Sequence, residues 1–138
     1  MLSIRGPQTF ERSLIAAGDT LNNAGLPTAA NELRAAVADL SRRPTPDVTG
    51  AIQHATASLE CVARHACGDE KATLGDLLKR NPDLIPRPLD EAIAKLWGFA
   101  PENGRHLREG REPTYADAEL VVSVAAATGN YLARKNDA

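Results

Sequence analysis

Apolar residues recur every three or four positions along most of the chain, which is the spacing of one face of an α-helix. This spacing predicts helices over residues 9–23, 27–41, 48–67, 73–80 and 88–98, and a long last helix that starts at about residue 114. Alternation of β-branched and aromatic residues, the pattern of a strand, never continues for more than a few positions. We therefore expect an all-α bundle of five or six helices that forms one domain over residues 1–138.

Residues that favour helix ends support these boundaries. Thr73 and Thr114 are each followed three positions later by an aspartate, the Thr-x-x-Asp form of a capping box. Thr9 is the expected N-cap of the first helix, and Pro27 suits the first turn of the second. Gly68, after the third helix, is a typical stop residue.

The last predicted helix is apolar on nearly every face, as Val121, Val122 and the run Val124–Ala127 show. A helix of this kind is either the central helix of a bundle or part of an interface between subunits, and both roles are compatible here. We expect a homodimer.

Composition narrows the classes of protein. Of the 138 residues, 43% are hydrophobic and 25% are charged, which is typical of a globular protein. The formal net charge of -2 argues against a protein that depends on non-specific phosphate contacts. Cys61 and Cys67 lie six positions apart and face different sides of one predicted helix, so we expect no structural disulfide. No stretch approaches 18 apolar residues, and we expect a cytoplasmic protein without a membrane segment.

The third predicted helix carries two sets of candidate side chains. His54, Cys61 and His65 share one face, a spacing that suits a metal, but no Cys-x-x-Cys or His-Glu-x-x-His motif accompanies them. We therefore predict no metal site and no cofactor. Glu60 and Arg64 have the i,i+4 spacing of an ion pair, which either supports the helix surface or orients a nearby base.

The segment 102–112 holds a second group of candidates. Arg105, Arg108 and Arg111 are balanced by three glutamates, and Gly104 precedes the pair Arg105-His106. Arginine binds phosphate, histidine exchanges protons near neutral pH, and the start of the last helix follows within ten residues. The segment is either a solvated charged loop or a phosphate-binding site.

Several motifs, taken in order, resemble a known family. They are the run AIQHATASLECVAR at 51–64, Gly68-Asp69, ATLG at 72–75, LWGF at 96–99, Gly104-Arg105-His106, DAEL at 117–120 and NYL at 130–132. In this order they are similar to an abortive-infection-type family of small bacterial helical domains related to HEPN proteins. These domains occur alone or at the C-terminus of phage-defence proteins, and the resemblance covers residues 10–133.

The resemblance implies a HEPN-like bundle that dimerises through its long helices. Active HEPN proteins carry an Arg-polar-x(3–5)-His motif near the start of a late helix and cleave RNA without a metal, using the ribose 2′-OH as nucleophile. Carried over, Arg105 and His106 are the catalytic pair, although here they are adjacent. Glu60 and Arg64 match the family's acidic–basic pair, and we assign them, with His54 and Arg108, supporting or phosphate-binding roles.

The sequence thus favours a bacterial defence or toxin-type protein that acts on RNA, as a metal-independent endoribonuclease of the dimer. One alternative is a non-catalytic HEPN-like module that binds RNA or a nucleotide with the same residues. Another is a helical scaffold or antitoxin-like partner of a defence system, which docks a second protein through the apolar last helix.

Overall fold

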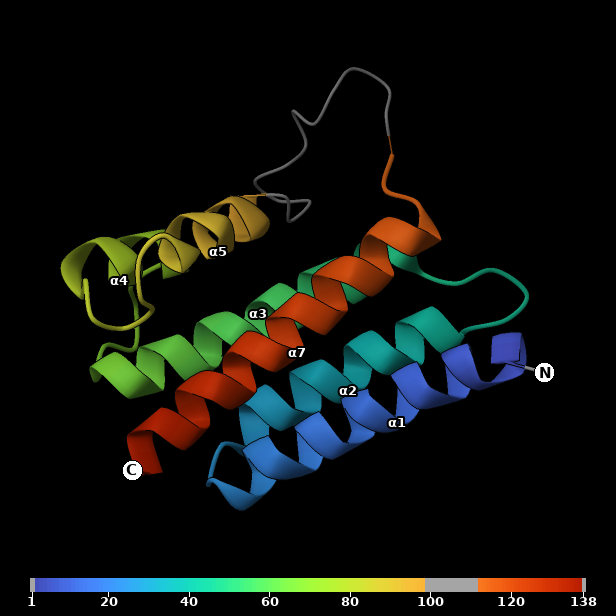
Figure 1. Ribbon diagram of the computed structural model, residues 1–138, viewed down its shortest axis with the longest axis horizontal. Coiled ribbons are helices and arrows are strands. Elements are labelled where there is room, and N and C mark those ends of the chain that lie inside the picture. The colour runs from blue at the N-terminus through green and yellow to red at the C-terminus, as the bar shows by residue number, and fades with distance from the viewer. Residues whose placement is uncertain (1, 99–111, 138) are drawn as a thin grey trace.

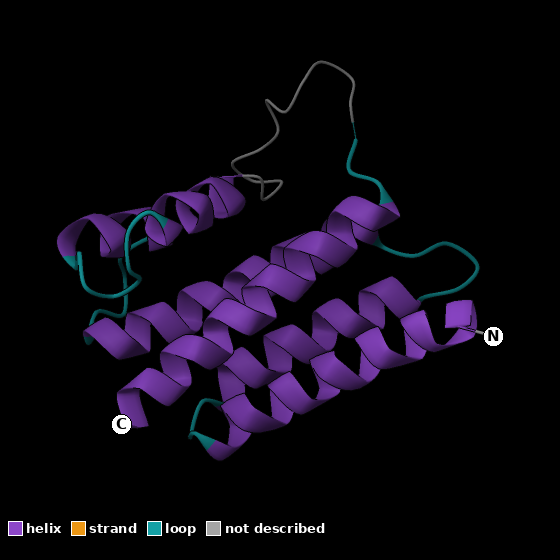
Figure 2. Cartoon of the chain, in the orientation of Figure 1, coloured by secondary structure: helices purple, strands orange, loops and turns teal. Residues whose placement is uncertain are grey.

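The computed structural model describes residues 2–98 and 112–137, and the side chains of residues 9–98 and 112–135. These residues form six helices and no strand, which confirms the predicted all-α class (Figure 2). The helices are α1 (Leu2–Asn23), α2 (Pro27–Ser41), α3 (Val48–Cys67), α4 (Leu74–Arg80), α5 (Leu89–Gly98) and α7 (Tyr115–Asp137). The last is the longest, at 23 residues, as predicted.

The predicted helix boundaries are correct except at the first helix. The expected start at Thr9 is wrong, because α1 begins at Leu2. Pro7 is the sixth residue of α1, so its missing N–H removes one i→i−4 hydrogen bond near the helix start, and the helix nevertheless extends across Gly6-Pro7.

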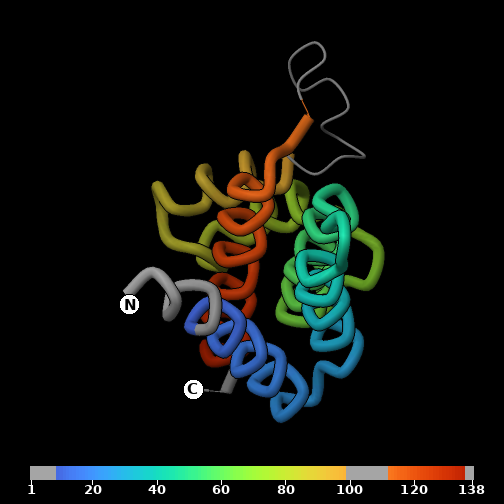
Figure 3. The backbone as a smooth tube through the Cα atoms, turned by 90° about the vertical axis from the view of Figure 1, so that its right-hand side faces the viewer, coloured from blue at the N-terminus to red at the C-terminus, as the bar shows by residue number. Residues whose placement is uncertain are grey.

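The four long helices lie side by side and form the bundle (Figure 1). α1, α3 and α7 run in one direction and α2 runs in the other. α7 contacts both α1 and α3, while α4 packs against α3 and α5 packs against α4, outside the four-helix bundle (Figure 3). The core is aliphatic, and its largest fully buried side chains are Leu21, Leu33, Ile52, Leu59, Leu74, Leu77, Leu132, Val62, Val122 and Thr56.

One face of the α7 helix packs into the bundle, where it contacts α3, α1 and α2. Ala118, Val122 and Leu132 are buried against the other helices. The opposite face remains apolar in part, because Leu120 is 64% exposed and Tyr131 is 43% exposed. The apolar residues on the inward face of α7 thus belong to the core of the bundle. Those on its outward face are accessible to another molecule.

Side-chain caps define the starts of three helices. Asp47 accepts a hydrogen bond from the N–H of Gly50 at 2.9 Å and caps α3. Thr73 accepts one from the N–H of Asp76 at 3.2 Å and caps α4. At α7, Thr114 accepts from the N–H of Asp117 at 3.1 Å, and the Asp117 carboxylate accepts from the N–H of Thr114 at 2.9 Å. This reciprocal pair confirms the predicted capping box.

Within the described part of the chain, every helix is too short or too polar to cross a membrane.

Gly129 of α7 offers a first stability prediction. A Cβ atom at this position would lie 3.7 Å from Cγ2 of Val62, an ordinary van der Waals distance, and the φ angle of Gly129 is not positive. We expect Gly129→Ala to raise the free energy of unfolding by about 0.5–1 kcal/mol, because alanine is the better helix former. Urea unfolding followed by circular dichroism at 222 nm measures the change.

The matched control is Gly25→Ala. Gly25 has a φ of 80°, and among the described residues no atom beyond its chain neighbours lies within 4 Å of the added Cβ, so backbone strain is what opposes the alanine. Gly25→Ala should therefore be less stable than the wild type. A loss of stability in Gly129→Ala as well would show that α3 and α7 pack too closely for the added methyl group.

Candidate functional site

The predicted catalytic residues lie outside the described residues. Arg105, His106 and Arg108 belong to the segment 99–111, which connects the end of α5 at Gly98 to the residues that precede α7. Their roles remain predictions. The structure does place the predicted supporting residues Glu60, Arg64 and His54, all of which lie on α3.

Glu60 and Arg64 form the predicted ion pair, with Nη2 of Arg64 2.9 Å from Oε1 of Glu60. Each side chain also has a second partner across the α3–α4 connection. Oε2 of Glu60 accepts a hydrogen bond from the N–H of Leu74 at 2.8 Å, and Nε of Arg64 donates to the carbonyl of Ala72 at 2.8 Å. The pair thus contributes more than support of a helix surface, because it binds the backbone of the segment that enters α4.

The Glu60 carboxylate completes the N-terminus of α4. Leu74 is the first residue of this helix, and its N–H has no acceptor within the helix. The Glu60 side chain is 16% exposed, so its charge is largely withdrawn from water and needs the two donors that it has. Thr73 caps the following turn, so α4 is capped both by its own segment and by α3.

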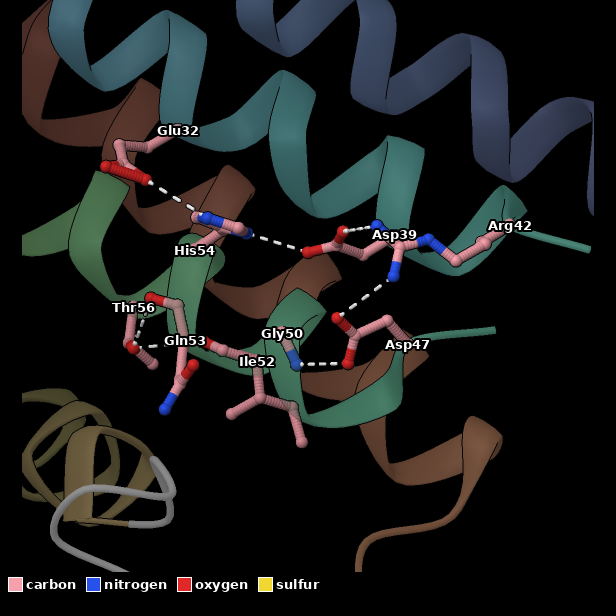
Figure 4. Close-up of polar contacts among 9 residues, drawn as sticks. All are labelled: Glu32, Asp39, Arg42, Asp47, Gly50, Ile52, Gln53, His54 and Thr56. Carbon is pink, nitrogen blue, oxygen red and sulfur yellow. Dashed lines mark hydrogen bonds and ion pairs between the residues drawn. The ribbon is translucent and has the colours of Figure 1, made fainter. Parts of the chain in front are cut away.

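His54 lies in a different place, between α2 and α3 (Figure 4). Its Nδ1 lies 2.7 Å from Oδ2 of Asp39, and its Nε2 lies 3.9 Å from Oε1 of Glu32. Asp39 is buried, while the His54 side chain is 41% exposed. A buried carboxylate that accepts from Nδ1–H fixes the orientation of the imidazole ring and leaves Nε2 toward Glu32 and solvent.

The Asp39 carboxylate is part of a larger polar network at the end of α2. Arg42 lies 3.8 Å from Oδ1 of Asp39 and 3.6 Å from Oδ2 of Asp47, so one guanidinium spans two carboxylates (Figure 4). The backbone carbonyl of Asp39 also accepts the N–H of Asp47 at 2.9 Å. This network joins the C-terminus of α2 to the N-terminus of α3.

The network leaves no space for a side chain at Gly50. A Cβ atom there would lie 2.4 Å from Oδ2 of Asp47 and 2.8 Å from Oδ2 of Asp39. Glycine at this position therefore allows the two carboxylates to approach the helix backbone.

The charge around His54 does not favour a phosphate. Glu32, Asp39 and Asp47 bring three carboxylates to the neighbourhood, and Arg42 already contacts two of them. A phosphate near His54 would meet unfavourable Coulomb interactions. The geometry instead gives His54 a role in joining α2 to α3.

Sequence reasoning missed Asp39 as the partner of His54. One signal was present, because Glu32 and Asp39 are seven residues apart and share a face of the second predicted helix. Asp39 also interrupts an apolar stretch between Val37 and Leu40. An acidic residue in that position needs a polar partner on a neighbouring helix.

Cys61 and His65, which share a face of α3 with His54, were considered as metal ligands. His65 is exposed, Cys61 is half-buried, and both cysteines are free thiols. Burial raises the pKa of the Cys61 thiol, as well as that of Cys67, so thiolate formation is disfavoured at neutral pH. Among the side chains that the structure describes, no three His, Cys, Asp or Glu residues are placed to hold a metal ion.

A groove runs along the seam between α1 and α7. It has a volume of about 760 Å³ and is lined by Phe10, Ser13, Leu14, Ala17, Ser123, Ala126, Ala127, Asn130, Tyr131, Arg134 and Lys135. Asn130 Nδ2 donates to the carbonyl of Ala17 at 3.2 Å beneath it, which joins the two helices. The groove continues onto the exposed face of α7 through Tyr131.

Comparison of the chain with protein-family models, with curated proteins and with solved structures gives no match.

Proposed function

We propose that this chain is a HEPN-like protein of a bacterial defence system, which acts on RNA in the cytoplasm as a metal-independent endoribonuclease. The proposal rests on the ordered motifs of residues 51–132, with Arg105 and His106 as the working pair. The observation that carries it is an all-helical architecture with a long last helix, because this is the fold that those motifs imply. The pair falls between α5 and that helix in the chain.

The proposed reaction needs only groups of the protein and the RNA. The ribose 2′-OH attacks the adjacent phosphorus, the bond from phosphorus to the 5′ oxygen breaks, and a 2′,3′-cyclic phosphate and a 5′-OH form. His106 either accepts the proton of the 2′-OH, in which case water protonates the leaving 5′ oxygen, or donates a proton to the 5′ oxygen, in which case water accepts the proton of the 2′-OH. Arg105 binds the non-bridging oxygens and stabilises the negative charge that develops on them, and Arg108 adds a phosphate contact.

A homodimer is part of this proposal. The outward face of α7 supports it, because Leu120 and Tyr131 are exposed there and Tyr131 also lines the α1–α7 groove. A surface of this kind suits a symmetric interface, in which the same patch of each copy contacts its partner.

The test uses purified protein and 5′-labelled RNA, both single-stranded and structured, in EDTA. We expect the wild type to cleave RNA and to leave cyclic-phosphate ends. His106→Ala should cleave at least about 100-fold more slowly than the wild type. Arg105→Ala should lose a similar factor. Arg87→Ala is the matched control, because the Arg87 side chain is 78% exposed and its ion pair among the described residues is with Asp90 of its own segment, at 3.7 Å.

Other outcomes assign the site differently. RNA that is bound but not cleaved by the wild type, with binding lost in Arg105→Ala and kept in His106→Ala, supports the non-catalytic binding module. Equal cleavage by all four proteins contradicts the assignment of Arg105 and His106. A protein that neither binds nor cleaves RNA at micromolar concentration contradicts the proposed function.

The α1–α7 groove supports a second candidate, a helical partner protein that docks another chain of its defence system. In that case the protein should be monomeric alone, and RNA should have no effect on it. Sedimentation of the purified chain separates the two candidates, because the first requires a dimer.

A further inference from the structure

Helices α4 and α5 form an arm, which we define as residues 74–98, on the side of the bundle. α5 packs mainly against α4 and not against the four long helices (Figures 1 and 3). The only tryptophan of the chain, Trp97, lies on α5 against α4, because a Cβ at Gly75 would be 3.9 Å from its ring. With 7 and 10 residues, these two helices are too short to be stable in isolation.

Charged side chains of the bundle hold both ends of α4 through backbone groups. At its start, Glu60 accepts from the N–H of Leu74 and Arg64 donates to the carbonyl of Ala72, both at 2.8 Å. Beyond its end, Nζ of Lys135 on α7 donates to the carbonyls of Asp83 and Leu84. The apolar face of the arm, which includes Leu77, Ile85 and Ile93, is buried.

We propose that Glu60 and Arg64 are positioning residues. They form a polar latch that fixes the N-terminus of α4 to α3, and through the arm they set the position of Gly98, where the chain continues toward Arg105 and His106. The effect on RNA rests on the proposed function, whereas the latch itself does not. Without the latch, the arm opens as a unit while the four long helices remain folded.

The physical basis is the cost of separating the latch from its partners. Leu74 is fully buried, so its N–H has no access to water. Glutamine at position 60 has one oxygen for two donors, so its NH2 group must face either the Leu74 N–H or the Arg64 guanidinium, and one of the two hydrogen bonds is lost. Arg64 would lose its only acidic partner in the latch, although it would keep the carbonyl of Ala72. Because these bonds join the arm to α3, their loss acts first on the arm.

Hydrogen exchange measured by mass spectrometry tests the latch. In Glu60→Gln, we expect amides of residues 74–80 and 89–98 to exchange at least about tenfold faster than in the wild type. Amides of residues 50–63 should change less than about threefold. Arg64→Lys keeps the charge but not the two separate donor nitrogens. The exchange rates of its arm amides should lie between those of the wild type and those of Glu60→Gln. Arg34→Gln is the matched control, because Arg34 forms an exposed ion pair with Asp19 at 3.3 Å between α1 and α2.

Two exchange results would overturn the proposal. One is no acceleration in the arm of Glu60→Gln, and the other is equal acceleration in the arm and the bundle. If Glu60→Gln does not fold, the wild type in low urea provides the same test. In low urea, the arm should open more often than residues 50–63, so its amides should exchange faster than theirs. A single opening rate shared by both regions would overturn the latch.

The consequence for RNA is measured separately. For Glu60→Gln at a temperature at which its helical signal matches the wild type, we expect kcat for RNA cleavage to fall at least about tenfold, with KM within about twofold. Unchanged cleavage with a faster-exchanging arm would overturn the positioning role. If the wild type has no action on RNA, the proposed function fails, and the exchange experiment still decides whether the latch exists.

Discussion

Replacing Gly50 with alanine is expected to lower the free energy of unfolding by about 2 kcal/mol, even though alanine is intrinsically the better helix former by about 1 kcal/mol. The added Cβ would lie 2.4 Å from Oδ2 of Asp47 and 2.8 Å from Oδ2 of Asp39, so both carboxylates must move. Asp47 then loses its position as the cap of α3, which contributes about 1 kcal/mol. Asp39 loses its hydrogen bond to His54, which contributes about 2 kcal/mol.

Urea unfolding at neutral pH, followed by circular dichroism, measures this effect. Gly129→Ala is the matched control, because it makes the same chemical change inside another helix, where the nearest atom is 3.7 Å away. The two substitutions should change stability in opposite directions. A Gly50→Ala protein as stable as the wild type would mean that the carboxylates move aside without loss.

Asp39→Ala is expected to lower the free energy of unfolding by about 2 kcal/mol, the contribution of a hydrogen bond to a charged group. The substitution removes a buried carboxylate that lies 2.7 Å from Nδ1 of His54. It also leaves Arg42 with Asp47 as its remaining acidic partner in this network. The gain in helix propensity from alanine offsets only a small part of the loss.

A double-mutant cycle assigns the loss to one contact. Combining Asp39→Ala with His54→Ala should cost at least about 1 kcal/mol less than the sum of the two single changes, because both remove the same hydrogen bond. Asp39→Asn should lose less than Asp39→Ala, since the amide oxygen still accepts from Nδ1–H. Additive single changes would show that the contact contributes nothing to stability.

Most of the helical structure follows from the sequence, because the features that determine it are local. The spacing of apolar residues gives the extents of α2, α3, α5 and α7. The cap at Thr114 was predictable from the Thr-x-x-Asp pattern alone. The start of α1 was not, because Gly6 and Pro7 have low helix propensity and Thr9 is a good N-cap residue, so both signals favour a later start.

The candidate site was less predictable, because its contacts join distant parts of the chain. The pairing of Glu60 with Arg64 follows from their spacing on one helix. Their bonds to the backbone at Ala72 and Leu74 depend on how the chain turns after α3, which no periodicity encodes. The partner of His54 likewise comes from α2, and only the packing of two helices brings Asp39 to it.

The position of α7 has a consequence for synthesis of the protein on the ribosome. Its residues complete the core between α1 and α3, and Asn130 binds the carbonyl of Ala17, 113 positions earlier in the chain. A nascent chain that has emerged only as far as α5 therefore still exposes apolar faces of α1 and α3. Cooperative folding of the bundle must wait for the last helix to leave the exit tunnel, and until then the emerging helices are natural substrates for chaperones.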